Sequence, residues 1–185
     1  MQPVSFEQWM EKNFHPGVMG YLKEELQMSD DEIMIEYDIW QSFTTTRVPS
    51  FFPGFIDIIN RFREDGGIVA VVSHSEKALI ERDYLSSNHG KAFLPDIIFG
   101  WDFDPEKRKP SAWPIYQLIE QFHLKTEELL IVDDLKPGLT MGNAAGVDTA
   151  AAGWAYDIES IRSYMKVHCI AYFDTVSKMS EFLFS

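Results

Sequence analysis

The sequence of 185 residues has a single cysteine, Cys169, and few basic side chains. One cysteine excludes an internal disulfide framework and leaves no basis for a zinc site built from thiolates. The 16 Lys and Arg stand against 29 Asp and Glu, a net charge of −13. Because nucleic-acid binding rests on clustered Lys and Arg, we expect no nucleic-acid partner. A small phosphorylated molecule held by one or two local cations remains compatible with this charge.

Long apolar runs are also missing. No stretch approaches the ~20 apolar residues of a membrane span, and Met1 to Lys12 lacks the apolar core of a signal peptide. We therefore expect a soluble, cytoplasmic protein without a membrane partner. Hydrophobic residues nevertheless make up 45% of the chain and aromatic residues 14%, enough for a substantial core. The length suits one domain, or one domain with a small appendage.

The start of the chain carries helix signals and no clear strand. Ser5 with Gln8, and Ser29 with Glu32, have the spacing of a capping box, in which the serine oxygen accepts a backbone N–H and the later side chain reaches back. Ile33–Trp40 carries a mixed signal, because its apolar residues fit both an alternating strand and a helical face. The cap that precedes this segment favours a helix.

From Gly66 onwards the sequence alternates between strand and helix signals. Five apolar segments each precede a helical pattern, which predicts a mostly parallel sheet covered by helices on both faces, an α/β fold with right-handed crossovers. The predicted strands are 68–72, 96–99, 129–132, 147–151 and 168–171.

The most informative stretch is Leu129–Val132 followed by Asp133 and Asp134. An apolar run that stops at two acids predicts a buried parallel strand delivering carboxylates to the sheet edge where open α/β folds keep their sites. Pro137 suits the first turn of a helix and Gly146 the residue past its end, so a βαβ unit follows. Neighbouring carboxylates repel each other unless a cation lies between them, which predicts a hard metal such as magnesium. The alternative is a solvated turn.

Two further strand ends carry candidate chemistry. Ser73 offers a hydroxyl and, with the amides that follow, a place for an anion; alternatively it only closes the turn. Lys109, before Pro110, is a point charge that could offset phosphate or carboxylate negativity, or simply lie in a surface loop. His74, beside Ser73, is a candidate substrate contact. The ends of parallel strands share one sheet edge, so we expect these residues to converge with the acidic pair.

These elements resemble the motifs of the haloacid dehalogenase-like phosphohydrolases, closest to the β-phosphoglucomutase and phosphoglycolate phosphatase-like branch. The resemblance implies a Rossmann-like core over residues 48–185 and a small helical cap over residues 1–47. The segments that carry it are Val71-Val72-Ser73, Lys109-Pro110, Ile131-Val132-Asp133-Asp134, Pro137-Gly138, Ala144-Ala145-Gly146 and Phe51-Phe52-Pro53-Gly54-Phe55.

The resemblance also implies an activity and roles for the site residues. It implies a magnesium-dependent phosphatase or phosphomutase acting on a small phosphorylated metabolite. Ser73 would bind the transferring phosphate, Lys109 would stabilise the charge of nucleophile and phosphate, and Asp133 and Asp134 would hold magnesium.

One family motif is absent. Members begin with an apolar strand ending in Asp-x-Asp, whose first acid attacks phosphorus and whose second acts as general acid and base; nothing before residue 48 fits. The run before Asp102 and Asp104 has the pattern but lies only five residues before Lys109, which leaves no loop for that lysine. We therefore interpret Asp102 and Asp104 as loop acids.

In the family the absent strand is central, between the strands that end at Ser73 and Asp133. Leaving its neighbours unpaired would cost about 1–3 kcal/mol for each buried backbone group. Another segment or a second copy could fill the gap, or the neighbours could pair directly. We favour an N-terminally incomplete chain that is inactive as written and binds magnesium weakly or not at all.

A different class of function also fits. The chain could be a non-catalytic relative that keeps the fold as a binding or interaction module. An unpaired sheet edge would favour association into a homo-oligomer.

Overall fold

The computed structural model describes residues 4–87 and 94–185, and its N-terminal part is helical as predicted. Both predicted capping boxes are present, at Ser5 with Gln8 and at Ser29 with Glu32. The segment with the mixed signal lies inside a helix, which confirms the interpretation from its cap. The N-terminal elements are α1 (Phe6–Phe14), α2 (Val18–Gly20), the π-helical turn η1 (Tyr21–Glu25) and α3 (Asp30–Thr45).

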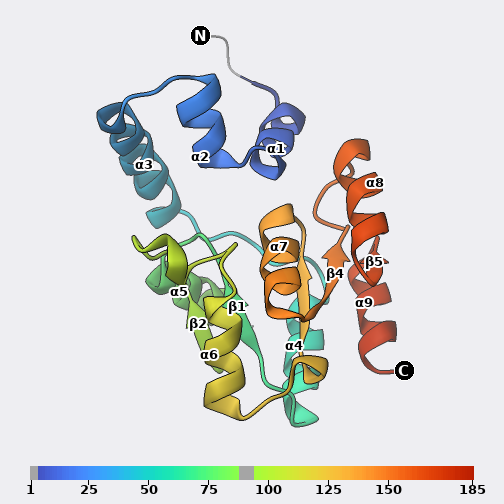
Figure 1. Cartoon of the computed structure of the whole chain (residues 1–185). Coiled ribbons are helices and arrows are strands. Elements are labelled where there is room, and N and C mark those ends of the chain that lie inside the picture. The colour runs from blue at the N-terminus through green and yellow to red at the C-terminus, as the bar shows by residue number, and fades with distance from the viewer. Residues whose placement is uncertain (1–3, 88–93) are drawn as a thin grey trace.

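The rest of the described chain alternates strands and helices. Its elements are α4 (Phe55–Glu64), β1 (Ala70–Val72), α5 (Lys77–Ser87), β2 (Ile97–Phe99), the 3-10 turn η2 (Pro105–Lys107), α6 (Trp113–Phe122), the 3-10 turn η3 (Thr126–Glu128), β3 (Leu130–Asp133), α7 (Lys136–Ala145), β4 (Asp148–Ala152), α8 (Glu159–His168), β5 (Ala171–Phe173) and α9 (Val176–Leu183). Figure 1 shows α1, α2 and α3 gathered at one end of this α/β part.

All observed strand pairs are parallel, which confirms the predicted fold class, but the strands form two separate sheets. β1 pairs with β2, placing Ala70 opposite Ile97. The second sheet has the order β3-β4-β5, with Leu130 opposite Asp148 and Ala150 opposite Ala171. Within residues 4–87 and 94–185, no strand pairs with the second edge of β1 or of β3. We call these two edges the open edges.

The two sheets share the same helical layers. On one face, α6 packs its Ile115 and Leu118 in a cluster that includes Val72 of β1 and Ile131 of β3. On the other face, α4 packs against both sheets, because its Phe55 contacts one cluster with Val71 and another with Val132. Two helices therefore span the space between the sheets, so the three-layer α/β/α arrangement is kept although the sheet is divided.

The open edges are accompanied by incomplete burial. A folded chain of 21.4 kDa is expected to expose about 9,100 Å², whereas this chain exposes 11086 Å². All residues of β1 and β3 are only partly buried, while Thr149, Ala150 and Ala151 in β4 are buried. Within the described residues β1 and β3 lie in separate sheets, so the alternative in which these two strands pair directly is wrong.

One predicted strand was placed too early. Residues 168–171 were expected to form the last strand, but α8 continues to His168 and β5 begins at Ala171. The His168 ring lies against Tyr164, one turn back, with ring centroids 3.9 Å apart, and its Nδ1 is 2.8 Å from the Tyr164 carbonyl. These contacts within the helix extend it beyond the point at which the apolar pattern alone predicts a strand.

Candidate functional site

An ion pair joins the two sheets at their carboxyl ends. Lys109 follows β2 and Asp133 ends β3, and Lys109 Nζ lies 2.7 Å from Asp133 Oδ2, with the side chains only 15% and 9% exposed. The Leu135 N–H donates to Asp133 Oδ1 at 2.9 Å, which fixes the other carboxylate oxygen. Gly138 makes room for this carboxylate, because a Cβ there would lie 2.3 Å from Asp133 Cγ. The local sequence therefore holds Asp133 in one position.

The end of β1 reaches the same place. His74 Nε2 lies 2.8 Å from the carbonyl oxygen of Lys109, and the Ser75 N–H donates to Ser73 Oγ at 3.1 Å. Burial is the main cause that lowers the pKa of His74. The ring is thus neutral near pH 7 with the proton on Nε2, because only an N–H can donate to the Lys109 carbonyl. His74, Lys109 and Asp133 form one chain of contacts.

Asp134 lies beside this chain of contacts. Its burial and the neighbouring Asp133 charge raise the pKa of Asp134, and Lys109 acts in the opposite direction. The Tyr156 hydroxyl donates to the Asp134 carbonyl at 2.8 Å. All five predicted site residues therefore lie at this edge of the sheets: His74, Lys109 and Asp133 in direct contact, Ser73 and Asp134 next to them in the chain.

Two carboxylates do not complete a magnesium site. Magnesium prefers about six oxygen ligands, and within the described ranges no group of three or more acidic, histidine or cysteine side chains could hold an ion. Both Asp133 oxygens already have partners, Lys109 and the Leu135 N–H. The acids present would need at least one more oxygen donor to fit this metal.

The acids of the loop after β2 play a local structural role, which confirms their interpretation as loop acids. Asp102 Oδ1 accepts from the Asp104 N–H at 2.8 Å, and Asp104 Oδ1 accepts from the Glu106 N–H at 3.0 Å. Strand β2 ends at Phe99, so neither acid directly follows a strand.

Three side chains beside the site were not predicted from the sequence. The Trp101 ring lies with its edge toward His74, at 6.2 Å between ring centroids, and 6.5 Å from Tyr37 of α3. The guanidinium of Arg108 lies over Trp101, 3.9 Å from the ring centroid. The only sequence signal was that Arg108 directly precedes Lys109. We call Tyr37, Trp101 and Arg108 the aromatic wall.

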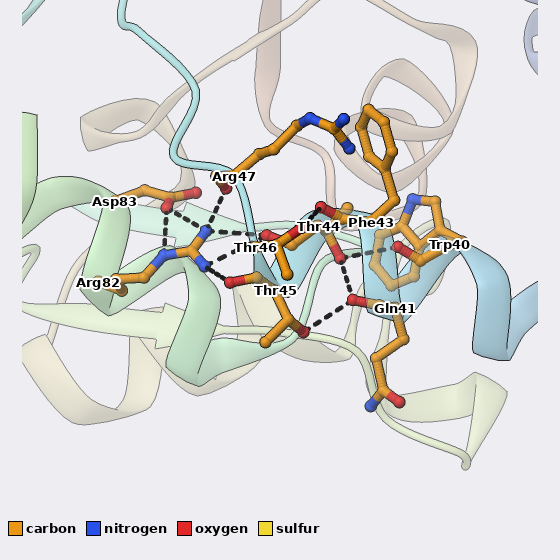
Figure 2. Close-up of polar contacts among 9 residues, drawn as sticks. All are labelled: Trp40, Gln41, Phe43, Thr44, Thr45, Thr46, Arg47, Arg82 and Asp83. Carbon is orange, nitrogen blue, oxygen red and sulfur yellow. Dashed lines mark hydrogen bonds and ion pairs between the residues drawn. The ribbon is translucent and has the colours of Figure 1, made fainter.

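Helix α3 is held over this edge by hydrogen bonds to α5 and to the residue before it. Glu76 Oε1 accepts from the Tyr37 hydroxyl at 2.8 Å and from Gln41 Nε2 at 2.7 Å. At the other end of the helix, Arg82 donates to the carbonyls of Thr44, Thr45 and Arg47 while Asp83 accepts from the same guanidinium, as Figure 2 shows. These carbonyls lie at and just beyond the C-terminal end of α3, where the helix dipole favours a cation.

Comparison with known proteins identifies one family. The profile of the family described as haloacid dehalogenase-like hydrolase matches residues 10–152. No curated protein matches the chain.

Several solved structures share the fold at low sequence identity. A haloacid dehalogenase-like family hydrolase from Streptococcus pneumoniae has a TM-score of 0.75 and 14% identity, covering 98% of this chain and 83% of its own. A predicted phosphoglycolate phosphatase from Haemophilus somnus has a TM-score of 0.63 and 16% identity, covering 86% and 71%. CbbY from Rhodobacter sphaeroides, solved with phosphate, has a TM-score of 0.56 and 18% identity, covering 75% and 60%. The chain spans 53% of another relative, from Lactobacillus delbrueckii.

Proposed function

The chain belongs to the haloacid dehalogenase-like hydrolase family, and we propose that it forms the core of a phosphatase acting on a small phosphorylated metabolite. The observation that carries this proposal is the buried pair of Lys109 Nζ and Asp133 Oδ2, 2.7 Å apart, which joins two sheets at the edge reached by His74. Two similar folds point the same way, since one is a predicted phosphoglycolate phosphatase and the other was solved with phosphate.

The proposed roles follow from the chemistry of each side chain. Lys109, a cation largely shielded from water, would stabilise charge that develops on phosphoryl oxygens. Ser73 would donate its hydroxyl, and the amides after β1 would add donors. His74 donates to the Lys109 backbone, so we assign it mainly to positioning this lysine, with its second ring nitrogen left as an acceptor for substrate.

We propose that hydrolysis needs an additional strand, N-terminal to Met1, and that the 185-residue chain alone is inactive. Losing a nucleophile typically costs on the order of 10⁴ to 10⁶ in rate. The support is the pair of open edges: β1 and β3 are separated although α4 and α6 contact both sheets. An apolar strand ending in Asp-x-Asp would pair with both edges and bring its acids beside Lys109.

The same strand would complete the ligand set for magnesium. Asp133 and Asp134 supply two carboxylates, and we propose that they bind magnesium weakly until a third is added. Magnesium would then supply charge stabilisation for the phosphoryl group. Residues 1–47 would act as the cap, since Glu76 and Arg82 hold α3 over the site. We place this activity in the cytoplasm, in keeping with the absence of thiolate or disulfide chemistry.

Among the helices that lie within the described residues, none is both long and apolar enough to cross a bilayer.

The decisive experiment adds the strand. An extension of about six apolar residues ending in Asp-x-Asp is fused before Met1, and magnesium-dependent hydrolysis of p-nitrophenyl phosphate is measured. We expect turnover with the extension. The rate should be at least about 10⁴-fold lower for the unextended chain, and also for an extension in which both added acids are changed to Asn. Hydrolysis by the unextended chain at the rate of the extended one, or equal rates for the Asp and Asn extensions, would refute the proposal.

A non-catalytic binding module is the second candidate. The engagement of both Asp133 oxygens within the protein favours it, because the carboxylate is already satisfied without metal. Isothermal titration separates the two: a metabolite bound tightly without magnesium, together with an extension that restores no turnover, would support the module.

A further inference from the structure

Arg108 is a cation without an acidic partner within residues 4–87 and 94–185. The chain has six arginines in an acidic sequence, and four of them form ion pairs: Arg61, Arg63, Arg82 and Arg162. Among the described residues, no carboxylate lies within ion-pair distance of Arg108 or Arg47. Arg47 lies over Phe43 on the surface of α3, with its guanidinium 3.8 Å from the ring centroid. Arg108 instead lies half-buried beside the candidate site.

The position of Arg108 is fixed from two directions. Its guanidinium lies over the Trp101 ring, and its Nη1 donates to the carbonyl of Asp102. The Trp101 backbone is fixed in turn, because its N–H donates to the Ser75 carbonyl at 2.8 Å. A stacked and hydrogen-bonded guanidinium has lost much of its freedom before any ligand arrives, which favours binding.

Glu76, the acidic side chain that binds α3, is already engaged by other donors. Glu76 already accepts from the Tyr37 hydroxyl and from Gln41 Nε2. The indole N–H of Trp101 is buried and also has no acceptor among the described residues. Among the described residues, the Trp101 indole N–H therefore has no acceptor and the Arg108 guanidinium has no acidic partner.

The two neighbouring cations differ in what balances them. Lys109 faces Asp133 in the core, whereas the Arg108 charge, one residue earlier, has no counterpart. Arg108 lies over Trp101, whose ring centroid is 6.2 Å from that of His74 and 6.5 Å from that of Tyr37, so its guanidinium lies near the place where the candidate site meets α3. A ligand whose phosphoryl group lies at Lys109 would extend toward Arg108. The planar guanidinium fork matches a carboxylate or a phosphate through paired hydrogen bonds.

We propose that Arg108, held against Trp101, binds a second anionic group of the substrate, so that the preferred substrates are phosphate esters that also carry a carboxylate or another phosphate. This inference rests on the proposed function, since it takes Lys109 as the phosphoryl site. It makes Arg108 a residue that determines specificity, on the leaving-group side of the ester.

Binding of probe compounds to the full chain tests the inference directly. Isothermal titration at fixed ionic strength compares ethyl phosphate, 2-phosphoglycolate and ethylene glycol bisphosphate. We expect the two probes with a second anionic group to bind at least about tenfold more tightly than ethyl phosphate, because that group can form charge-assisted hydrogen bonds with the guanidinium. Tighter binding of 2-phosphoglycolate than of the bisphosphate identifies a carboxylate as the second group, and the reverse order identifies a phosphate.

Variants distinguish a specific contact with Arg108 from a general effect of positive charge on anion binding. Arg108→Gln should abolish the preference, weakening the two probes with a second anionic group much more than ethyl phosphate, and Arg108→Lys should keep only part of the preference because the fork is lost. Arg47→Gln removes the other unpaired arginine and should keep the preference in full. Unchanged thermal unfolding of Arg108→Gln shows that the variant is folded.

Several outcomes would overturn the inference: equal affinity for all three probes, no binding of any probe, or equal losses in Arg108→Gln and Arg47→Gln. Its failure can be told from failure of the proposed function. If the strand extension restores hydrolysis but the probes show no preference, only the role of Arg108 is wrong. If the preference is present and depends on Arg108 but the extension gives no hydrolysis, the catalytic proposal fails while the anion site stands.

Discussion

Strand β4 and the strands β1 and β3 have the same parallel geometry but very different surroundings. β4 pairs on both edges, with β3 and with β5, and Ala150 and Ala151 are 0% and 1% exposed. β1 and β3 each pair on one edge, and every one of their residues is partly exposed. A parallel strand is normally buried on both faces and both edges, so β4 shows what β1 and β3 lack.

The difference coincides with the candidate chemistry. Ser73 and His74 follow β1 and Asp133 ends β3, so the candidate site residues lie at the carboxyl ends of the two strands that have an open edge. There the side chains of Lys109 and Asp133 form an ion pair, and within the described residues no ladder of backbone hydrogen bonds joins β1 to β3. A buried ion pair thus joins the two sheets at their carboxyl ends, in addition to the contacts that α4 and α6 make with both of them.

The largest expected effect comes from breaking that junction. Lys109→Met leaves Asp133 nearly buried with no cation, and removal of one partner from a buried pair typically costs about 3–5 kcal/mol. We expect the free energy of unfolding in urea to fall by about 3 kcal/mol, since the lysine keeps some contact with solvent.

The matched control is Lys107→Met, two residues earlier. Lys107 is 48% exposed and lies 3.7 Å from Asp104, and exposed pairs contribute about 0–1 kcal/mol. Adding Asp133→Asn to Lys109→Met should recover part of the loss. Similar losses at positions 107 and 109 would show that the junction is held by something other than this pair.

A smaller loss of stability is expected when a valine is shortened, and its size should differ between the region of β4 and β3. Val147, directly before β4, is 4% exposed, and Val132 in β3 is partly exposed. Removing two methyl groups costs about 0.8 kcal/mol each when buried, plus a cavity term. We expect Val147→Ala to lower the free energy of unfolding by about 2 kcal/mol and Val132→Ala by about 1 kcal/mol. Equal losses would mean that β3 is as well packed as the region of β4.

Sequence alone predicted well the βαβ unit of β3, α7 and β4 and the N-terminal helices, because the signals for these elements are local. The apolar run before Asp133, Pro137 in the first turn of α7 and Gly146 after its end specify that βαβ unit, and Gly146 takes the left-handed conformation with a φ of 69°. The capping boxes likewise determine α1 and the start of α3. Each of these signals involves neighbours in the chain, which periodicity and capping rules describe.

The remainder depends on contacts between distant segments. Glu76 meets Tyr37 across 39 residues, and Trp101 has its partners on three different segments. No spacing rule relates these residues. The family resemblance predicted that the first strand of the family is absent between the ends at Ser73 and Asp133, but it left open how the neighbouring strands would be arranged. Their arrangement in two separate sheets, with α4 and α6 packed against both, depends on contacts between distant segments that no local pattern describes.

The smallest effect concerns pH and probes how deeply the end of β1 is buried. Burial lowers the pKa of His74 below its ordinary value; the hydrogen bond to the Lys109 carbonyl and the Asp133 charge act against it, and the charges of Lys109 and Arg108 act with it. Below about pH 6.5 the unfolded chain binds a proton that the folded chain does not. The free energy of unfolding should therefore fall as pH drops from 6.5 toward the folded pKa, and less so in His74→Gln. Urea titrations of both proteins between pH 5 and 8 measure this. Identical pH dependence would indicate that His74 is solvated, and that the open edges leave the end of β1 accessible to water.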